Sequence, residues 1–418
     1  MKPVTYIIIG AGSRGTGYAS YALRYPDQAE VVGVAEPRDP ARLRLVTEHD
    51  IPPHNIYTDW REVAERERFA DAVVITTQDA MHAEPAIALA QKGYHILLEK
   101  PMAPNAADCQ RIVEAVKASG VILGVGHVML YTPYTQTLKK IIDDGAIGEI
   151  VSIQHLEPVG YWHQAHSFVR GNWRNEQESS FMLLAKSCHD LDWLRYIMGE
   201  RCLSVSSFGA LKHFRKEEKP KEAGAALRCL ECDYEPKCPY SAKKIYLGRL
   251  AQGRTGWPVG ILTFDVTVEG VTEALRTGPY GRCVYECDND VVDHQVVNML
   301  FEGRKTASFT MTAFTEAAPR RTSIFGTRGE IYGDGYKIYL TDFLTDQKKE
   351  IDVPAPDASI VGGHGGGDYG LMSAFITAVS KNDPSMLLSG PDETLESHLM
   401  VFAAEQARRE NRVVHLYS

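Results

Sequence analysis

The sequence predicts two parts of different fold class: an α/β domain built on a parallel sheet, then an α+β domain with an open, mainly antiparallel sheet. Over residues 1–127, short apolar runs alternate with helical patterns, which is typical of parallel strands joined by crossover helices. Over residues 128–418, several strand-like runs follow one another with glycine or charged turns between them, which indicates antiparallel pairing. We therefore expect two domains that meet near residue 127.

Each element of the first part is predicted by its own pattern. Short apolar runs between turn signals indicate buried strands, and they lie at 5–10, 30–36, 71–77, 95–100 and 121–126. Helical patterns separate these runs near 15–25, 40–49, 60–66, 83–92 and 105–118. The last of these helices begins at Asn105, a residue type that is favoured as an N-cap.

The turn after the first predicted strand has the glycine spacing of a dinucleotide site. It reads GAGSRG over residues 10–15, with Gly10, Gly12 and Gly15 in the G-x-G-x-x-G pattern and Ser13 and Arg14 between them. The glycines permit a tight turn, close approach to a pyrophosphate and close packing of helix on strand. The turn follows a strand, opens a helix, and is followed by Glu36 at the end of the second strand, as this Rossmann fingerprint requires. A glycine-rich turn without a ligand is the alternative.

The residues after the second strand bear on the choice between NAD and NADP. Glu36 would accept hydrogen bonds from the adenosine ribose and repel a 2′-phosphate, which favours NAD. Arg38 and Arg14 oppose this, because a guanidinium group near the ribose could bind a 2′-phosphate. The predicted cofactor is NAD, with NADP as the less favoured alternative.

Composition excludes several classes of partner. The chain has 418 residues and a formal net charge of −9, so a nucleic-acid or anionic-membrane surface is not expected. No apolar run approaches the roughly 20 residues that span a bilayer. Eight scattered cysteines do not form a secreted disulfide pattern, so we expect a cytoplasmic protein with reduced thiols or metal ligands.

Two further motifs carry a resemblance to a known family. HILLEKP at 95–101, TTQDAMH at 76–82 and the glycine fingerprint resemble the Gfo/Idh/MocA oxidoreductases, and the resemblance extends over essentially the whole chain. It implies a Rossmann domain at 1–127 and a substrate-binding and oligomerisation domain at 128–418. In the EKP tripeptide, it implies that Lys100 lies at the nicotinamide and contacts the reacting oxygen, while Pro101 shapes the turn. It also implies a cofactor-binding set in these motifs: Thr76, Thr77, Gln78, His82, Glu99 and Lys100.

The segment AKSCHDLD at 185–192 is the second candidate for the chemistry, because it places ionisable groups in an otherwise apolar helix. The family has an Asp-x-x-x-His pair here; His189 matches the histidine, but Ala185 stands at the aspartate position. Lys186 lies three residues before His189, on nearly the same helix face. We predict that Lys100, His189 and Lys186 form the catalytic and substrate-binding core, and that Lys186 favours an anionic sugar. A histidine satisfied inside the core is the alternative.

The second part contains predicted strands and an insertion. Strand-like runs lie at 150–158, 202–211, 290–301, 306–314, 321–327, 329–334 and 336–342. The insertion, at about 211–283, contains Cys229, Cys232 and Cys238 in the spacing C-x2-C-x5-C, which suits structural zinc with Cys283 as the first choice of fourth ligand. Three reduced thiols in a loop are the alternative. One face of the sheet is expected to pair with another subunit in a homo-oligomer, a dimer or tetramer.

Other polar and aromatic residues are candidates for substrate contacts. Tyr131 follows the last Rossmann strand, Trp162 and His163 lie in an aromatic-rich irregular stretch that suits stacking on a sugar ring, and His364 lies in the flexible motif HGGGD. Ordinary loop packing explains these residues equally well.

Three functions fit these observations. The first is an NAD-dependent oxidoreductase that acts by hydride transfer on a secondary alcohol of a sugar, a sugar derivative or a cyclitol. The second is an NAD-dependent glycosidase that cleaves glycosides through transient C3 oxidation and elimination, with no net redox change. It needs a further base, for which Tyr131, His163 or His364 are the candidates. The third is a non-catalytic NAD-binding regulator, against which Lys100 and His189 argue.

Overall fold

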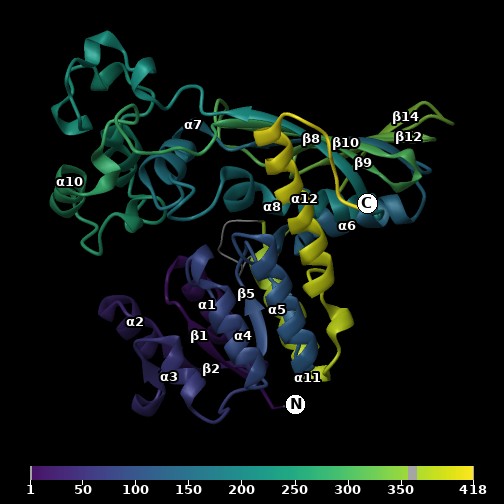
Figure 1. The fold of residues 1–418 in the computed structure, drawn as a ribbon, viewed down its shortest axis with the longest axis horizontal. Coiled ribbons are helices and arrows are strands. Elements are labelled where there is room, and N and C mark those ends of the chain that lie inside the picture. The colour runs from purple at the N-terminus through teal and green to yellow at the C-terminus, as the bar shows by residue number, and fades with distance from the viewer. Residues whose placement is uncertain (1, 356–364, 418) are drawn as a thin grey trace.

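The strands of the protein form two separate sheets (Figure 1). The structure is a computed structural model that describes residues 2–355 and 365–417. The first sheet is parallel, with the strand order β3-β2-β1-β4-β5-β6. Its strands are β1 (Val4–Ile9), β2 (Ala29–Ala35), β3 (Ile56–Tyr57), β4 (Ala72–Ile75), β5 (His95–Leu98) and β6 (Leu123–Val125). The predicted α/β domain is confirmed.

Helices cover both faces of this sheet, which explains why its central strands are apolar almost throughout. The crossover helices are α1 (Ser13–Arg24), α2 (Asp39–His49), α3 (Trp60–Glu65), α4 (Ala83–Gln91) and α5 (Ala106–Ser119). At the start of α5, the side chain of Asn105 accepts a hydrogen bond of 2.9 Å from the backbone N–H of Asp108, as expected of an N-cap.

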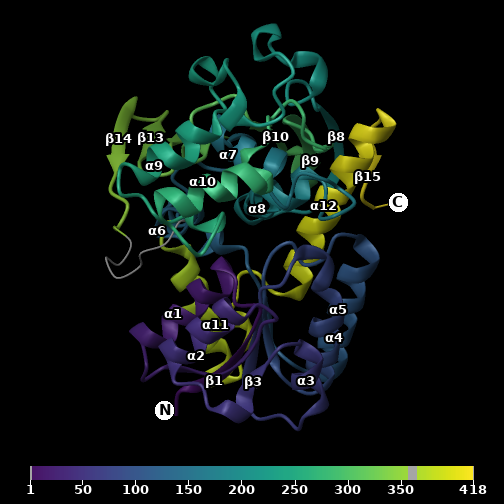
Figure 2. The ribbon, with the colours of Figure 1, turned by 90° about the vertical axis from the view of Figure 1, so that its left-hand side faces the viewer.

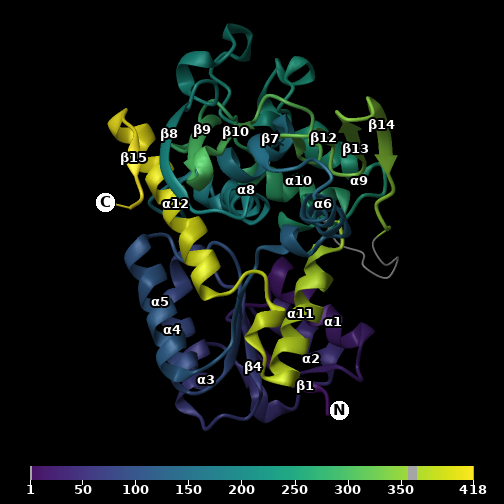
Figure 3. The ribbon, with the colours of Figure 1, turned by 90° about the vertical axis from the view of Figure 1, so that its right-hand side faces the viewer.

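The C-terminal part of the chain returns to the first domain. Helix α11 (Gly367–Lys381) packs on α1 and β1, and its Leu371 and Phe375 lie in the apolar core of that domain (Figures 1 and 3). Helix α12 (Pro391–Glu410) packs on α5 at one end and on α8 (Met182–Met198) and β8 farther along. The two domains therefore share a helical connection that lies far from residue 127 in the sequence.

The second sheet is mixed but mainly antiparallel, and β7 with β10 is its parallel pair. The strand order is β14-β13-β12-β11-β7-β10-β9-β8-β15. The strands are β7 (Ile150–Pro158), β8 (Cys202–Ala210), β9 (His294–Phe301), β10 (Thr306–Thr312), β11 (Arg321–Gly326), β12 (Gly329–Gly333), β13 (Ile338–Asp342), β14 (Gln347–Ile351) and β15 (Val414–His415). Helices α8 and α12 lie between this sheet and the first domain (Figure 1). The predicted α+β class is confirmed.

Helical segments also lie between the first domain and α8. Helix α6 (Pro133–Asp143) begins at the N-cap Thr132, and the short helix α7 (Tyr161–His163) leads into the π-helix η4 (Gln164–Arg170). π-Helical segments often occur at functional sites, so the position of η4 matters for the site.

The insertion forms a lobe with its own apolar core beside the second sheet (Figures 1 and 2). It contains the π-helix η9 (Lys243–Leu247), α9 (Gly248–Leu250) and α10 (Val268–Thr277). Tyr246 of η9 and Val271 of α10 pack with Ala165 and Val169 of η4. The lobe is therefore attached to the segment that leads into α8.

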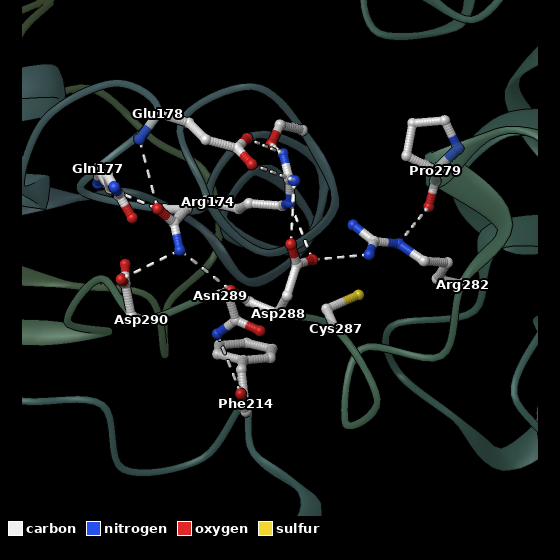
Figure 4. A network of polar contacts seen from close by, with 12 residues as sticks. Arg174, Gln177, Glu178, Phe214, Pro279, Arg282, Cys287, Asp288, Asn289 and Asp290 are labelled. Atoms are coloured by element: carbon white, nitrogen blue, oxygen red, sulfur yellow. Dashed lines mark hydrogen bonds and ion pairs between the residues drawn. The ribbon is translucent and has the colours of Figure 1, made fainter.

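Polar contacts fasten the end of the lobe to the same region (Figure 4). Asp288 accepts hydrogen bonds from Arg174 Nε at 2.9 Å and from Arg282 Nη1 at 2.6 Å. These contacts, with Arg174 the larger, hold the pKa of Asp288 below its usual range. Asn289 donates a 3.0 Å hydrogen bond to the carbonyl oxygen of Phe214.

Candidate active site

The glycine turn lies where the fingerprint predicts, between β1 and α1. Gly10 has a φ of +94°, and a Cβ atom there would lie 2.9 Å from the carbonyl oxygen of Thr76. A Cβ atom on Gly15 would lie 2.1 Å from the carbonyl oxygen of Gly10. Both positions therefore exclude side chains, and the backbone N–H groups at the start of α1, near Gly12 and Ser13, can bind a pyrophosphate.

Glu36 is buried and hydrogen-bonded to the glycine turn. One carboxylate oxygen accepts a 2.7 Å hydrogen bond from the backbone N–H of Ala11, and the other accepts one of 2.7 Å from Arg38 Nε. Burial acts to raise the pKa of Glu36, but these hydrogen bonds, with Arg38 the largest contributor, lower it overall. The residue is therefore an anion at neutral pH, and the charge of Arg38 is paired with it.

Arg14 pairs with carboxylates next to Lys100 and at the start of α11. Its Nε donates a 2.5 Å hydrogen bond to Glu99, and its Nη2 lies 2.7 Å from Asp368, at the start of α11. Tyr18 also donates to Glu99, at 2.9 Å. Two carboxylates occupy the guanidinium group, so its expected role as a 2′-phosphate ligand is not supported.

Lys100 reaches from the first domain to helix α8 of the second. Its Nζ donates a 2.6 Å hydrogen bond to the carbonyl oxygen of Ala185, in the first turn of α8. Ala185 is the position at which the family pattern has an aspartate, and His189 lies one turn farther along the helix. The Lys100–Pro101 peptide bond is cis. Lys100 is thus held one helical turn before His189, the residue with which it is expected to act on one alcohol.

The charged residues of α8 are explained by partners on the second sheet. Lys186 Nζ lies 3.2 Å from Glu157 of β7, which also pairs with Arg320 at 2.6 Å. Arg320 pairs with Asp190 at 2.9 Å, and His155 lies 3.2 Å from the same carboxylate. Lys186 is therefore not a free cation, which corrects the simplest interpretation of the sequence.

The protonation of this network follows from its burial and its pairs. Burial lowers the pKa of Lys186, although Glu157 opposes this effect. Burial acts to raise the pKa of Asp190, but the charge of Arg320 and the hydrogen bond from His155 lower it overall. The site therefore contains an ionised carboxylate, Asp190, and a lysine, Lys186, whose protonated form is stabilised mainly by Glu157.

His127 was not predicted as a site residue. It follows β6 and is fully buried, and its ring makes edge-to-face contacts with His189 and with His398 of α12, each at 5.6 Å between centroids. Burial, with the charges of Arg195 and Lys100, lowers the pKa of His127 to about 3, so the ring is neutral. The motif GH directly after the last Rossmann strand is the sequence signal that could have identified it.

Asp192 of α8 belongs to the same buried group. Its carboxylate lies 3.8 Å from His127 Nδ1 and 3.5 Å from Arg195 Nε. Burial raises the pKa of this carboxyl, although Arg195 opposes the effect. Its carboxylate also interacts with Ser397 and His398 of α12.

The aromatic residues near η4 form one cluster with the insertion. The ring of Trp162 lies 5.2 Å from that of Trp257, and the guanidinium of Arg249 lies 4.0 Å above it. His163 lies 4.9 Å from Trp257, and burial together with the charge of Lys186 lowers its pKa well below the usual value. Trp257 was not predicted from the sequence; it is half exposed and comes from the insertion.

Tyr131, a predicted substrate contact, is hydrogen-bonded within the protein. Tyr131 uses its hydroxyl to accept hydrogen bonds from the backbone N–H groups of Leu388 and Ser389, at 2.9 and 3.1 Å. It is also bonded to Ser389 Oγ at 2.9 Å, so the group holds the segment before α12 and its expected contact with substrate is not supported. His364 lies outside the described residues.

The cysteines of the insertion do not form the predicted zinc site. Within the described part of the chain, no three or more histidine, cysteine or acidic side chains are arranged to hold a metal ion. Cys229 Sγ lies 3.4 Å from the buried guanidinium of Arg170, and a cation beside a sulfur atom opposes metal binding there. Burial raises the pKa of Cys238 to about 11 and also raises that of Cys283. Like Cys232, these residues are free cysteines, and zinc is not supported.

The fold and the glycine turn together indicate an oxidoreductase of the dinucleotide-binding class. Residues 4–127 match the oxidoreductase family described as having an NAD-binding Rossmann fold, and residues 139–416 match the C-terminal alpha/beta domain of the same family. The chain belongs to the Gfo/Idh/MocA oxidoreductase family, as the sequence predicts.

Relatives in this family act on sugars and cyclitols. The chain is 30% identical over 199 residues to 2,7-anhydro-N-acetylneuraminate hydratase of Mediterraneibacter gnavus, which covers 48% of this chain and 50% of the relative. It is 28% identical over 278 residues to scyllo-inositol 2-dehydrogenase (NAD(+)) of Bacillus subtilis, covering 66% of this chain and 68% of that enzyme. The match thus spans about half the length of the first relative.

A solved structure supports the fold over the whole chain. An oxidoreductase from Agrobacterium radiobacter, in complex with NAD+, L-tartaric acid and magnesium, superimposes with a TM-score of 0.72 at 14% identity. The match covers 99% of this chain and 98% of that protein. In the described ranges 2–355 and 365–417, no helix has the length and apolar character needed to cross a membrane.

Proposed function

We propose that this protein is an NAD-dependent oxidoreductase that oxidises a secondary alcohol of a sugar, a sugar derivative or a cyclitol by hydride transfer. The observation that carries the proposal is the 2.6 Å contact between Lys100 Nζ and Ala185 O, one helical turn before His189. It brings a cation from the carboxyl end of β5 to helix α8, one turn before the imidazole of His189. Such ends of parallel strands are where ligands of Rossmann domains bind.

In this mechanism NAD, when bound, accepts the hydride, and the protein manages the proton. The ammonium group of Lys100 stabilises the negative charge that develops on the substrate oxygen. His189 accepts the hydroxyl proton, because histidine exchanges protons readily near neutral pH. The buried ring of His127 packs against His189 and fixes its position.

The preference for NAD over NADP is supported by the pairing of both candidate arginines. Glu36 is an anion at the end of β2 and would repel a 2′-phosphate. Arg38 is paired with Glu36, and Arg14 is occupied by Glu99 and Asp368. Neither guanidinium group is available to a phosphate without breaking an ion pair.

We propose that the substrate is a carbohydrate with an anionic group. Around the end of α8, the three cations Lys100, Lys186 and Arg320 outnumber the two carboxylates Glu157 and Asp190, which leaves one net positive charge. An anion bound beside Lys186 would also offset the effect of burial, which disfavours its protonated form. The relative from Mediterraneibacter gnavus, named for an acidic sugar derivative, is consistent with this class.

The second candidate function is a redox-neutral glycosidase that cleaves glycosides through transient C3 oxidation and elimination. One observation favours it: His163 has a lowered pKa and lies among Lys186, Arg320 and Lys100, where it is a neutral base in addition to His189. Sugar release without net NADH formation would identify this function, whereas steady NADH formation identifies the dehydrogenase.

The test is NADH production over a panel of neutral and acidic sugars, cyclitols and glycosides. Lys100→Met should lower kcat by about 10²- to 10³-fold, the range for loss of one group that stabilises a developing oxyanion. NADH binding should change little, because the nucleotide turn is intact. Full activity of the variant with any active sugar would refute the proposed role of Lys100.

We propose a cytoplasmic homo-oligomer, a dimer or tetramer, that pairs through the outer face of the second sheet. The outward row on β7 to β11 is formed mainly by uncharged residues, among them Ser206, Phe208, Asn298 and Ser308, and Arg321 is a charged member of this row. A sheet face this poor in charge suits burial against a second copy. Phe208→Lys should shift the mass measured by light scattering toward the monomer.

A further inference from the structure

The insertion contributes an exposed aromatic ring beside α7 and η4. Trp257 is 50% exposed, although other rings pack against it. The ring centroids of Trp162, His163 and His166 lie 5.2, 4.9 and 5.4 Å from that of Trp257. A large apolar side chain that stays half exposed inside such a cluster is unusual, because its surface could have been buried. Exposed apolar surface of this kind is typical of a binding site.

The rings around Trp257 are themselves held in place. His166 stacks on Tyr280 with 4.9 Å between centroids, and its Nδ1 lies 2.9 Å from the hydroxyl oxygen of Tyr246. Tyr246 is completely buried in the core of the lobe. The position of Trp257 is therefore fixed before a ligand binds, which lowers the entropy cost of binding.

His163 connects this cluster to the candidate active site. It belongs to α7, whose three residues are all partly exposed. It lies close enough to Lys186, Arg320 and Lys100 for their charges to act on it. Lys100 is the residue expected at the reacting oxygen. Trp257, which contacts His163, is thus separated from the reacting group by about one side chain.

Arg249 supplies hydrogen-bond donors at the same place. Its guanidinium group lies 4.0 Å above the ring of Trp162, and its Nη1 donates a 3.0 Å hydrogen bond to the carbonyl oxygen of Ile245. Within residues 2–355 and 365–417, Arg249 forms no ion pair with a carboxylate and no second hydrogen bond to the protein. A guanidinium group has several N–H groups, so donors remain for the oxygen atoms of a ligand.

We propose that Trp257, Trp162 and Arg249 form a second sugar-binding subsite. The substrate is then a glycoside of at least two sugar rings, of which one reacts beside Lys100 and the next stacks on Trp257. A pyranose ring has a face of C–H groups and a rim of hydroxyl oxygens, which matches an aromatic face beside guanidinium donors. The inference rests on the proposed function, because the first ring is the one whose alcohol is oxidised.

The experiment compares pairs of probes that share the reacting sugar. Each pair consists of the methyl glycoside of glucuronic acid, galacturonic acid or glucose, and the disaccharide in which the same sugar is linked to a further glucose unit. NADH formation and sugar release are both followed, so that either candidate function gives a signal. In the wild type, KM should be lower for the disaccharide than for the methyl glycoside by about tenfold to fiftyfold, as expected for covering roughly half of a tryptophan ring.

Variants assign this difference to the subsite. Trp257→Ala should raise KM for the disaccharide by about the same factor and leave the methyl glycoside unaffected, because it removes binding that contributes equally before and during the reaction. Trp257→Tyr keeps an aromatic face and should retain most of the affinity. Arg249→Gln should raise KM for the disaccharide by about threefold to tenfold, the contribution of one or two hydrogen bonds. The control is Phe264→Ala, at a residue of the same lobe that is 70% exposed, and it should behave as the wild type.

The wild-type comparison stays decisive if Trp257→Ala fails to fold. Equal KM values within every active pair, or activity confined to cyclitols and free monosaccharides, would overturn the subsite alone. An equal loss for both members of a pair in Trp257→Ala would also overturn it, because the ring would then act on the first sugar. Absence of activity with all of these probes and with the wider panel of sugars and cyclitols would overturn the proposed function as well.

Discussion

Removing one partner of the ion pair between Lys186 and Glu157 should lower the free energy of unfolding by an amount that depends on which partner is replaced. Glu157→Gln removes the carboxylate 3.2 Å from Lys186 Nζ, and Lys186→Met removes the cation instead. After Lys186→Met, Glu157 still pairs with Arg320 at 2.6 Å, so no buried charge is left alone. After Glu157→Gln, Arg320 still has Asp190, but Lys186 loses the carboxylate with which it pairs among the described residues.

The magnitudes follow from this asymmetry. Two charges 3.2 Å apart attract each other by about 5 kcal/mol at an effective dielectric constant of about 20, before the cost of burial is subtracted. Leaving one buried charge without its partner typically costs about 3–5 kcal/mol, and we expect this for Glu157→Gln. Lys186→Met should cost about 1 kcal/mol, because the remaining charges stay paired and the methionine fills most of the space.

The loss of stability in Glu157→Gln should depend on pH in a definite direction. Burial already lowers the pKa of Lys186, and Glu157 opposes that shift, so Glu157→Gln lowers the pKa further. The unfolded lysine keeps a pKa of about 10.4, and between the two values the unfolded state binds more protons. Stability therefore rises with pH in this window, and the deficit of Glu157→Gln should narrow as the pH is raised.

The assay is urea denaturation followed by tryptophan fluorescence, at neutral pH and near pH 9, on the wild type, both single variants and the double variant. Equal losses in the two single variants would refute the idea that Arg320 shields Glu157. A deficit of Glu157→Gln that does not change with pH would refute the assignment of a protonated, buried Lys186.

Further predictions concern the cofactor, a structural hydroxyl and the thiols. Glu36→Gln should lower the ratio of kcat/KM with NAD to that with NADP by about tenfold or more, because it removes the anion that repels a 2′-phosphate; an unchanged ratio would contradict this role. Tyr131→Phe should lower stability by about 1–3 kcal/mol, because the N–H groups of Leu388 and Ser389 lose their acceptor, with kcat unchanged. A loss of kcat at unchanged stability would instead place the hydroxyl at the substrate. Incubation with a metal chelator should leave the melting temperature unchanged, since Cys229 lies against Arg170; a clear decrease would restore the zinc hypothesis.

Local patterns predicted the fold because the two domains use different sequence periods. The parallel strands are buried on both faces and read as continuous apolar runs, and the glycine turn carries a fixed spacing. The edge strand β14 was missed, because QKKEI at 347–351 is exposed and charged and looks like a loop. The return of α11 to the first domain was also missed, since packing between distant segments leaves no local signal.

The candidate site was predictable where a residue belongs to a motif. Lys100 and His189 were predicted in this way, and Lys100 contacts α8 at Ala185, one turn before His189. The partner of Lys186 was not predictable, because Glu157 lies on a strand 29 positions earlier in the sequence and only the fold brings the two together. The partner of Tyr131 was not predictable for the same reason, because Ser389 lies 258 positions away.

The two edges of the second sheet limit the ways in which copies of this chain can associate. At one edge, the exposed strand β14 carries Lys348, Lys349 and Glu350, and side chains of this kind discourage the addition of a foreign strand. At the other edge, the strand β15 covers β8 along Ser204 and Val205. Addition of a further strand, the route to fibrils, is therefore disfavoured at both edges of the sheet. A closed symmetric oligomer is thus favoured over open-ended association through the sheet edges.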